Sequence, residues 1–377
     1  MRTVHPFIQI RFGAKTSVKC KNWWLYLILS VCSIIPNDFS TIRAQSLAHW
    51  NITNEEGLPS MTVYSIIQDS TGYIWFGTAN GIARYDGSTF KSYKIPGAYN
   101  SDISYLNQDA LGRIWGINFS GGLFFIEHDS MRLFNNSAEQ RIIDYYLTAD
   151  SIYYFSNKLI QANSLKQLND SAKIYGHIRL DNTNNSIAGK IDNKLLISTG
   201  KNLFAASLSS KSIDTMSFKY FRSTKSIEGQ LYFWNLFPSN TIGIWSAKNG
   251  TKEFRITGAE KRLEITKVIE YEGFIYITAK SGLFKAIVID NEIRIQKHYF
   301  KGQFLTNILF DTENSLWITT LRNGVKLIPD INTERSNENS VFGFERVTQI
   351  LPADSFLFLG GLKKTPLVPE IYSPPSV

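Results

Sequence analysis

Residues 62–94 read TVYSIIQDSTGYIWFGTANGIARYDGSTFKSYK, and residues 102–134 read DISYLNQDALGRIWGINFSGGLFFIEHDSMRLF. The two stretches match position by position, because Asp69-x-x-Gly72-x-Ile74-Trp75 aligns with Asp109-x-x-Gly112-x-Ile114-Trp115. Stronger and weaker copies continue along the chain, with the aromatic or apolar marker near positions 75, 115, 153, 196, 232, 276, 317 and 357. Their mean spacing of roughly 40 residues is typical of a four-stranded propeller blade.

Turn chemistry divides each repeat into short strands. In the first copy we expect strands over 63–68, 73–78, 82–85 and 90–94. Asp69 to Gly72 has the residues of a type I turn, and Asn80-Gly81 tolerates the positive φ of a tight hairpin. No stretch has a convincing 3.6-residue periodicity. The pattern therefore predicts an all-β fold, a seven-bladed β-propeller of four-stranded antiparallel blades.

The Trp and Asp of the repeat are interpreted structurally. Trp75, Trp115 and Trp317 lie among apolar residues, so we expect them to fill the space between neighbouring blades. The Asp-x-x-Gly element has too few closely spaced oxygen ligands for a calcium loop. It is interpreted as a turn.

The ends of the repeat array predict how the ring closes. After its third strand near 325–328, the seventh unit continues into a polar run over 330–340 without a convincing fourth strand. Residues 48–52 precede the first unit much as the fourth strand of the first unit, residues 90–94, precedes the second unit. We therefore expect residues 48–52 to form the outer strand of the seventh blade. The predicted organisation is a seven-bladed propeller over 45–340, and a truncated start of a second propeller with a disordered tail over 341–377.

Residues 1–44 are predicted to be a signal peptide or an N-terminal anchor. Residues 1–45 carry six Lys or Arg and one Asp, which is +5 of the chain's formal net charge of +8. These charges precede an apolar run over 23–35, which is short for a membrane span but typical of a signal-peptide core. Leu29-Ser30-Val31-Cys32 also faintly resembles a lipoprotein box. We expect a periplasmic or exported protein, or one anchored in the membrane through this segment.

Composition excludes several classes of protein. A chain that is 43% hydrophobic is too apolar to remain disordered. The net charge of about +3 outside the leader is too small for a nucleic-acid surface, which needs many phosphate contacts. The sequence thus predicts a folded protein that does not bind nucleic acid.

The sequence offers no catalytic or metal-binding constellation. Both cysteines, Cys20 and Cys32, lie in the leader, and the five histidines are isolated from one another. Neither GxxxxGK[ST] nor GxSxG occurs. We therefore assign no catalytic, cofactor-binding or metal residues and expect no cofactor and no enzymatic activity in this chain. No ligand-binding residue can be selected from the sequence.

Residues 57–87, GLPSMTVYSIIQDSTGYIWFGTANGIARYDG, resemble the two-component regulator propeller repeat. This repeat is found in the periplasmic sensor regions of bacterial hybrid two-component systems and sensor histidine kinases. The resemblance implies a periplasmic ligand-sensing propeller of a signal transduction system that works through a phosphorelay. The kinase domain itself has no counterpart in this sequence, so the chain is interpreted as truncated before any membrane helix or histidine kinase domain.

The resemblance also implies partners. These are a small-molecule ligand such as a glycan fragment, a sensor kinase domain in the parent protein or in a separate chain, and a second copy in a homodimer. Two other functions remain open. The chain could be a stand-alone envelope propeller that acts as a protein-interaction scaffold, or a propeller enzyme.

Overall fold

The computed structural model describes residues 45–95, 101–134, 141–156, 159–168, 173–177, 186–191, 194–198, 203–207, 212–216, 222–225, 231–234, 238–246, 250–332, 334–336, 346–353 and 356–362. The chain divides into two compact units, Met1–Ala44 and Gln45–Val377, and all described residues belong to the second. The leader over 1–44 and the tail over 363–377 lie outside the described residues, so their predicted roles stay predictions.

The described residues form strands and no helix, as the sequence predicts. Consecutive strands pair antiparallel into four-stranded units, which we number as blades in chain order. Blade 1 consists of β3 (Val63–Gln68), β4 (Ile74–Thr78), β5 (Gly81–Tyr85) and β6 (Phe90–Tyr93), and blade 2 of β7 (Tyr105–Gln108), β8 (Ile114–Ile117), β9 (Leu123–Glu127) and β10 (Ser130–Leu133). Blade 3 consists of β11 (Ile142–Leu147), β12 (Ser151–Ser156), β13 (Leu159–Ser164) and β14 (Lys173–His177), and blade 4 of β15 (Ser186–Ile191), β16 (Lys194–Ser198), β17 (Leu203–Ser207) and β18 (Ile213–Met216).

Blades 5 to 7 complete the set of four-stranded units that the described residues form. Blade 5 consists of β19 (Arg222–Lys225), β20 (Leu231–Trp234), β21 (Thr241–Ser246) and β22 (Gly250–Thr257), and blade 6 of β23 (Ile265–Tyr271), β24 (Phe274–Ala279), β25 (Gly282–Ile289) and β26 (Glu292–Tyr299). Blade 7 consists of β27 (Leu305–Phe310), β28 (Leu316–Thr320), β29 (Val325–Ile328) and β2 (Trp50–Ile52). We interpret these units as the seven blades that the repeat predicts.

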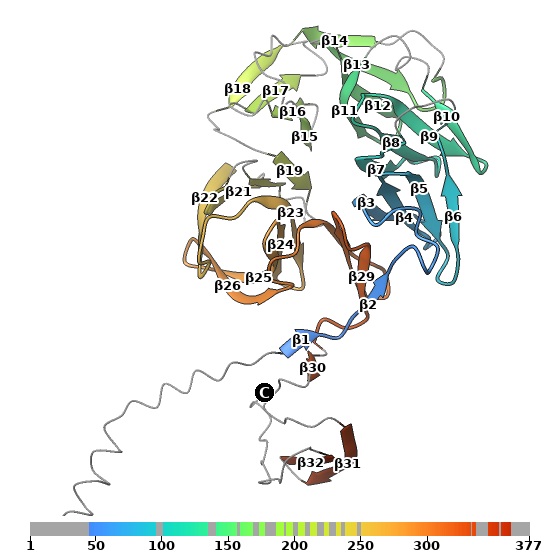
Figure 1. Cartoon of the computed structure of the whole chain (residues 1–377). Helices are drawn as coiled ribbons and strands as arrows, with labels where there is room; N and C mark the ends of the chain where they lie inside the picture. The colour runs from blue at the N-terminus through green and yellow to red at the C-terminus, as the bar shows by residue number, and fades with distance from the viewer. Residues whose placement is uncertain are drawn as a thin grey trace, which may run out of the picture. The chain divides into compact units, whose positions relative to one another are not determined.

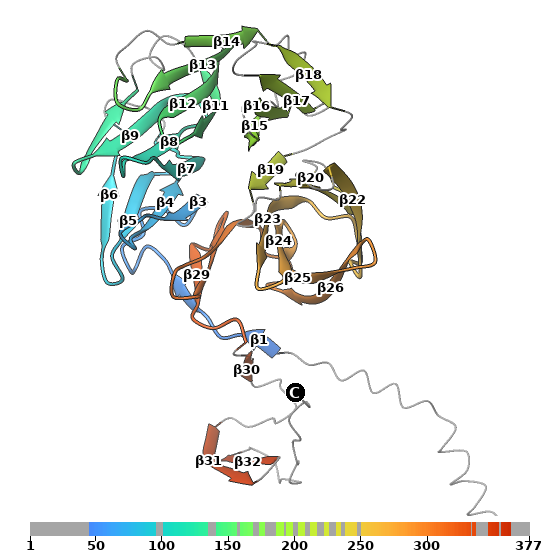
Figure 2. The same ribbon diagram turned by 180° about the vertical axis from the view of Figure 1, so that it is seen from behind.

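The first strands of the blades follow one another around a ring (Figure 1). β3 contacts β7, β11 contacts β15, and the series continues through β19, β23 and β27 back to β3. Blades 2 and 3 meet where the Tyr145 hydroxyl donates a hydrogen bond to the Trp115 carbonyl at 3.0 Å. The view from behind shows the same succession of sheets (Figure 2).

Turn residues determine where the strands of blade 1 begin and end. The Gly72 N–H donates to the Asp69 carbonyl at 3.0 Å, which closes the predicted turn. Gly72 has a φ of 95° and Gly81 a φ of 93°, a region that glycine enters without a steric penalty. Each observed strand of this blade agrees with its predicted range to within one residue at either end.

The ring closes as predicted, through the start of the chain. Trp50–Ile52 pairs antiparallel with β29, and Ile52 lies opposite Val325. A Cβ on Gly324 would collide with the Ile52 carbonyl oxygen. In the same way, a Cβ on Gly81 would collide with the Tyr93 carbonyl oxygen, and a Cβ on Gly282 with the Tyr299 carbonyl oxygen. Because Tyr93 and Tyr299 belong to the fourth strands of blades 1 and 6, Ile52 occupies the fourth-strand position of blade 7.

The Trp residues of the repeat pack between blades, which confirms their predicted role. Trp317 of blade 7 shares a core cluster with Phe76 of blade 1, and the two ring centroids are 6.0 Å apart. Trp75 packs against Ile103 and Phe124 of blade 2. All the marker Trp side chains are buried.

Two joins between strands were not predicted. β22 of blade 5 pairs parallel with β26 of blade 6, so these two blades form one eight-stranded sheet. The polar run over 330–340, expected to lack a strand, contains β30 (Glu334–Ser336), which pairs with β1 (Gln45–Leu47).

In the region assigned to a second propeller, β31 (Arg346–Ala353) pairs with β32 (Phe356–Leu362). The domain boundaries and the second propeller remain predictions.

Candidate functional site

The repeat Asp does more than close a turn. In blade 2, Asp109 Oδ1 accepts hydrogen bonds from the backbone N–H groups of Leu111 and Arg113, each at 2.9 Å. Asp109 Oδ2 accepts one from Trp115 Nε1 at 2.8 Å. Asp69 binds Trp75 in the same way at 2.6 Å, and Asp311 binds Trp317 at 2.7 Å. One carboxylate thus fixes the turn and orients the Trp that packs against the next blade.

The residue before the Asp joins each of these turns to the preceding blade. Gln108 Oε1 accepts a hydrogen bond from the Ser70 backbone N–H at 2.8 Å. Gln68 makes the equivalent contact with the backbone N–H of Thr312, also at 2.8 Å. The Gln-Asp pair therefore holds the turns of blades 7, 1 and 2 in a fixed relation on one side of the ring.

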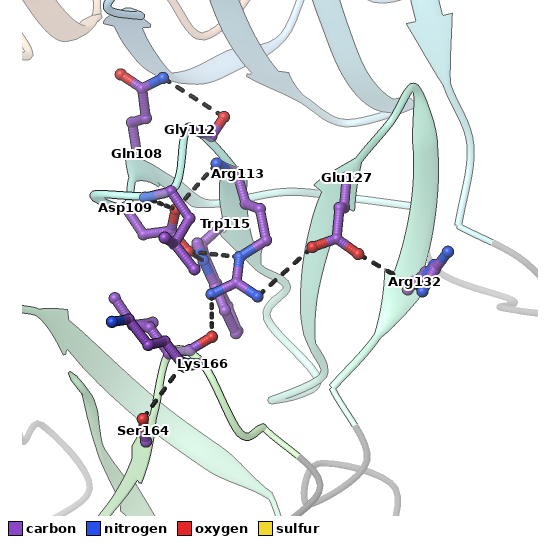
Figure 3. Close-up of polar contacts among 11 residues, drawn as sticks. Gln108, Asp109, Gly112, Arg113, Trp115, Glu127, Arg132, Ser164 and Lys166 are labelled. Carbon is purple, nitrogen blue, oxygen red and sulfur yellow. Dashed lines mark hydrogen bonds and ion pairs between the residues drawn. The ribbon is translucent and has the colours of Figure 1, made fainter. Parts of the chain in front are cut away.

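Blade 2 adds a buried arginine to this arrangement (Figure 3). Arg113 Nε donates to Asp109 Oδ2 at 2.7 Å, and the side chains are 7% and 0% exposed. Arg113 Nη2 donates to the Leu165 carbonyl of blade 3 at 2.8 Å. Because the guanidinium is held from both blades, this contact couples blade 2 to blade 3.

An outer carboxylate extends the cluster towards solvent. Glu127 lies 3.6 Å from Arg113 Nη1 and 3.6 Å from Arg132 Nη1, on opposite sides of the carboxylate (Figure 3). The guanidinium carbon of Arg113 also lies 5.6 Å from the ring centroids of Trp115 and Phe125. The charge of Arg113 is therefore compensated entirely within the protein.

A cleft of about 520 Å³ opens beside these turns, where β7, β11 and β15 end. Its volume lies in the range of small-molecule sites, and it is a shallow depression that is widely open to solvent. Side chains of three blades line it, among them Asn107, Gln108, Asp109, Tyr146, Thr148 and Lys190. The cleft is thus built from the same end of three neighbouring first strands.

The cleft is located where the repeat departs from its own pattern. The residue opposite the marker aromatic is apolar in three blades, Ile67 opposite Trp75, Ile269 opposite Tyr276 and Leu309 opposite Trp317. In blades 2 and 3 the same position holds Asn107, opposite Trp115, and Tyr146, opposite Tyr153. The same position holds Gly189 opposite Leu196 in blade 4 and Thr224 opposite Tyr232 in blade 5, so it varies among the blades. In blades 2 and 3 it brings Asn107 and Tyr146 to the cleft.

The acceptor groups of the cleft are already in use. Asn107 Oδ1 accepts the Gln108 backbone N–H at 2.9 Å, and both Asp109 oxygens are occupied as described. Thr148 Oγ1 accepts the Ser151 backbone N–H at 3.1 Å. A ligand would therefore meet mainly donors.

The donors of the cleft are free to interact. No described residue forms an ion pair with Lys190 or accepts a hydrogen bond from the Asn107 amide nitrogen. Burial raises the pKa of the Tyr146 phenol, and a hydrogen bond donated by the Lys190 backbone N–H to the phenol oxygen opposes this shift. The phenol keeps its proton at neutral pH, and its O–H can donate.

A second, smaller cavity of about 270 Å³ lies between blades 1 and 2, but its charges are paired. Asp129 accepts from Arg84 at 3.2 Å, from Lys91 at 2.8 Å and from the Tyr93 hydroxyl at 2.5 Å. The hydrogen bonds from Lys91 and Tyr93 lower the pKa of Asp129 to about 2. This network joins two blades and leaves little charge for a ligand.

No catalytic, cofactor or metal residue was predicted, and the cleft residues were not singled out from the sequence. The described residues contain no group of three or more His, Cys, Asp or Glu side chains that could hold a metal ion. His49 and His298 hydrogen-bond to backbone carbonyls of Leu47 and Ser281. A partial signal for the cleft was Asn107, which stands opposite the marker in blade 2 where blades 1, 6 and 7 have an apolar residue. Thr224 of blade 5 gives the same signal away from the cleft.

Comparisons with known proteins agree with this fold. The family model of the two-component regulator propeller matches residues 57–80. The extracellular domain of a proposed hybrid two-component system from B. thetaiotaomicron is 16% identical with a TM-score of 0.63, and the alignment covers 83% of this chain and 47% of that domain. A second such domain from the same organism is 14% identical with a TM-score of 0.62, at 87% and 47% coverage. The chain spans about half the length of each.

An enzyme shares the architecture as well. Virginiamycin B lyase from Staphylococcus aureus is 17% identical with a TM-score of 0.58, over 75% of this chain and 99% of the lyase. At these identities the likeness shows the fold alone. No curated protein matches the chain by sequence, and the described residues contain no apolar helix of membrane-spanning length. The chain is a β-propeller that carries a two-component regulator propeller repeat.

Proposed function

We propose that this chain is the ligand-sensing propeller of a two-component signal transduction system and that it acts outside the cytoplasm. The regulator propeller repeat and the extracellular sensor domains with the same fold support the signalling role and the location. The observation that carries the proposal is the cleft, in which donors from three blades remain available for a small molecule.

The cleft offers a physical route from binding to signalling. A ligand that contacts Asn107, Tyr146 and Lys190 would touch the first strands of blades 2, 3 and 4 together. It would bind most tightly to one relative position of these strands. A ligand can shift a conformational equilibrium only through such a difference in affinity between states. The partner that receives the shift is proposed to be a sensor kinase domain, in the same protein or in a separate chain.

We favour a sensor over a propeller enzyme. The cleft presents an amide, a phenol and an ammonium group, while its carboxylate, Asp109, is committed to Arg113 and Trp115. General acid–base catalysis needs a group within reach of the substrate that is free to exchange a proton near neutral pH. The described cleft residues suit binding better than turnover.

Gene deletion and complementation would test the proposal. Transcript levels in the host are compared across a panel of small-molecule growth substrates, with and without the gene. We expect at least one set of transcripts to lose its substrate response on deletion and to regain it with the wild-type gene but not with the Asn107→Ala gene. Cell fractionation should place the protein outside the cytoplasm. Unchanged responses on every substrate, or a purely cytoplasmic protein, would contradict the proposal.

A further inference from the structure

The cleft between blades 2, 3 and 4 shows an imbalance between donors and acceptors that determines what it can bind. The oxygens of Asn107, Asp109 and Thr148 accept hydrogen bonds from protein N–H groups. The side-chain donors that remain are the Asn107 amide nitrogen, the Tyr146 O–H and the Lys190 ammonium. A ligand that fits must supply acceptors.

The charge of the cleft has the same consequence. Asp109 is neutralised by Arg113 at 2.7 Å, whereas Lys190 is half-buried and no described residue forms an ion pair with it. A cation that is partly removed from water gains most from a charge-assisted hydrogen bond with an anion. Among the described residues, the cleft therefore has one positive charge without an ion-pair partner.

We propose that the cleft binds a small organic anion, whose acid group contacts Lys190 and whose neighbouring oxygens accept hydrogen bonds from Asn107 and Tyr146. This inference rests on the proposed sensing function for its biological role, but binding itself can be tested apart from signalling. A carboxylate, a sulfate ester and a phosphate ester share the required chemistry. A sugar acid of one or two rings is a suitable size for a cleft of about 520 Å³.

Calorimetry on the purified full chain would separate these anions from a neutral analogue. The probes are glucuronate, glucose 6-sulfate, glucose 6-phosphate and uncharged glucose. We expect at least one anion to bind about tenfold or more tightly than glucose, with an affinity that falls as salt is raised. The strongest probe identifies the acid group. Equal affinity for glucose and the anions, or no binding of any anion at millimolar concentration, would overturn the proposal.

Two lysine variants locate the binding. Lys190→Gln removes the cleft charge, and Lys301→Gln removes an exposed charge from the turn before β27. We expect anion affinity to fall at least about tenfold in the first variant and to stay unchanged in the second. Equal losses in both would point to a non-specific charge effect and contradict the site. Matching thermal unfolding curves establish that each variant is folded.

A chemical footprint gives an independent readout. Lysine acetylation of the wild-type chain, followed by mass spectrometry, measures how accessible each ammonium group is. The tightest anion should slow acetylation of Lys190 and leave that of Lys301 unchanged. If Lys190 reacts at the same rate with and without a bound anion, the anion is elsewhere and the proposal is wrong. Bound anion with protected Lys190 but no transcriptional role in the host would leave the site intact and reject only the sensing function.

Discussion

Replacing Arg113 with Met should destabilise the propeller far more than replacing any exposed arginine near it. The substitution keeps much of the apolar stem and removes the guanidinium. Asp109, whose side chain is 0% exposed, would lose the cation at 2.7 Å. The Leu165 carbonyl would lose its donor from blade 2 at the same time.

The expected cost follows from what remains around the carboxylate. Breaking a buried ion pair by removing one partner costs about 3–5 kcal/mol, because a buried charge is left uncompensated. Asp109 keeps hydrogen bonds from two backbone N–H groups and from Trp115, which offset part of this loss. We therefore expect the lower end, about 3 kcal/mol. Arg132 is 58% exposed and 3.6 Å from Glu127, so Arg132→Met should cost no more than about 1 kcal/mol.

Equilibrium urea unfolding, followed by tryptophan fluorescence, measures both variants against the wild type. The midpoint should fall for Arg113→Met without a change in the denaturant slope, which shows that the compactness of the folded and unfolded states is unaffected. The double variant Asp109→Asn/Arg113→Met should lose less stability than the sum of the single variants, because the two groups interact directly. A cost for Arg113→Met equal to that for Arg132→Met, or strict additivity in the double variant, would refute the role of the buried pair.

Three further outcomes are expected. Gly324→Ala should destabilise the chain by at least about 2 kcal/mol more than Gly72→Ala in thermal or urea unfolding. Both glycines have a positive φ, but only at Gly324 would a Cβ meet the carbonyl of the closing strand. Equal costs would argue against closure at this contact. Asp129→Asn should lower stability at pH 7 but not near pH 2. The folded protein depresses the pKa of this carboxyl to about 2, so its contribution to stability is present above the unfolded pKa near 4 and is lost as pH falls. A pH-independent difference would contradict the ion network. Asp311→Ala should lower the melting temperature and change the fluorescence of Trp317, whose Nε1 loses its acceptor at 2.7 Å; an unaltered spectrum would show that the contact is not formed in solution.

The blade architecture could be predicted because its determinants are local. An Asp and a Gly three residues later favour a turn between two runs of apolar residues, and alternating apolar residues on either side favour strands. Closure was predictable for a similar reason, because residues 48–52 have the pattern of an outer strand without a blade of their own. The pairing of β22 with β26 has no such local signal. It depends on how two neighbouring blades are oriented, which a pattern within either blade does not specify.

The cleft was missed because repeat alignment gives weight to what the copies share. The shared residues, such as Asp69 and Trp75, hold a blade together and pack it against the next. A binding site on a ring of similar blades must instead use positions at which one or two copies differ. Opposite the marker, an apolar residue packs against the core in blades 1, 6 and 7, and Asn107 of blade 2 replaces it with a hydrogen-bonding amide. Tyr146 of blade 3 keeps the apolar packing and adds a hydroxyl. An amide in place of an apolar side chain weakens packing unless it gains a partner. Ligand contacts in a degenerate repeat should therefore be sought where a copy becomes polar at an aligned position and a cavity adjoins that position.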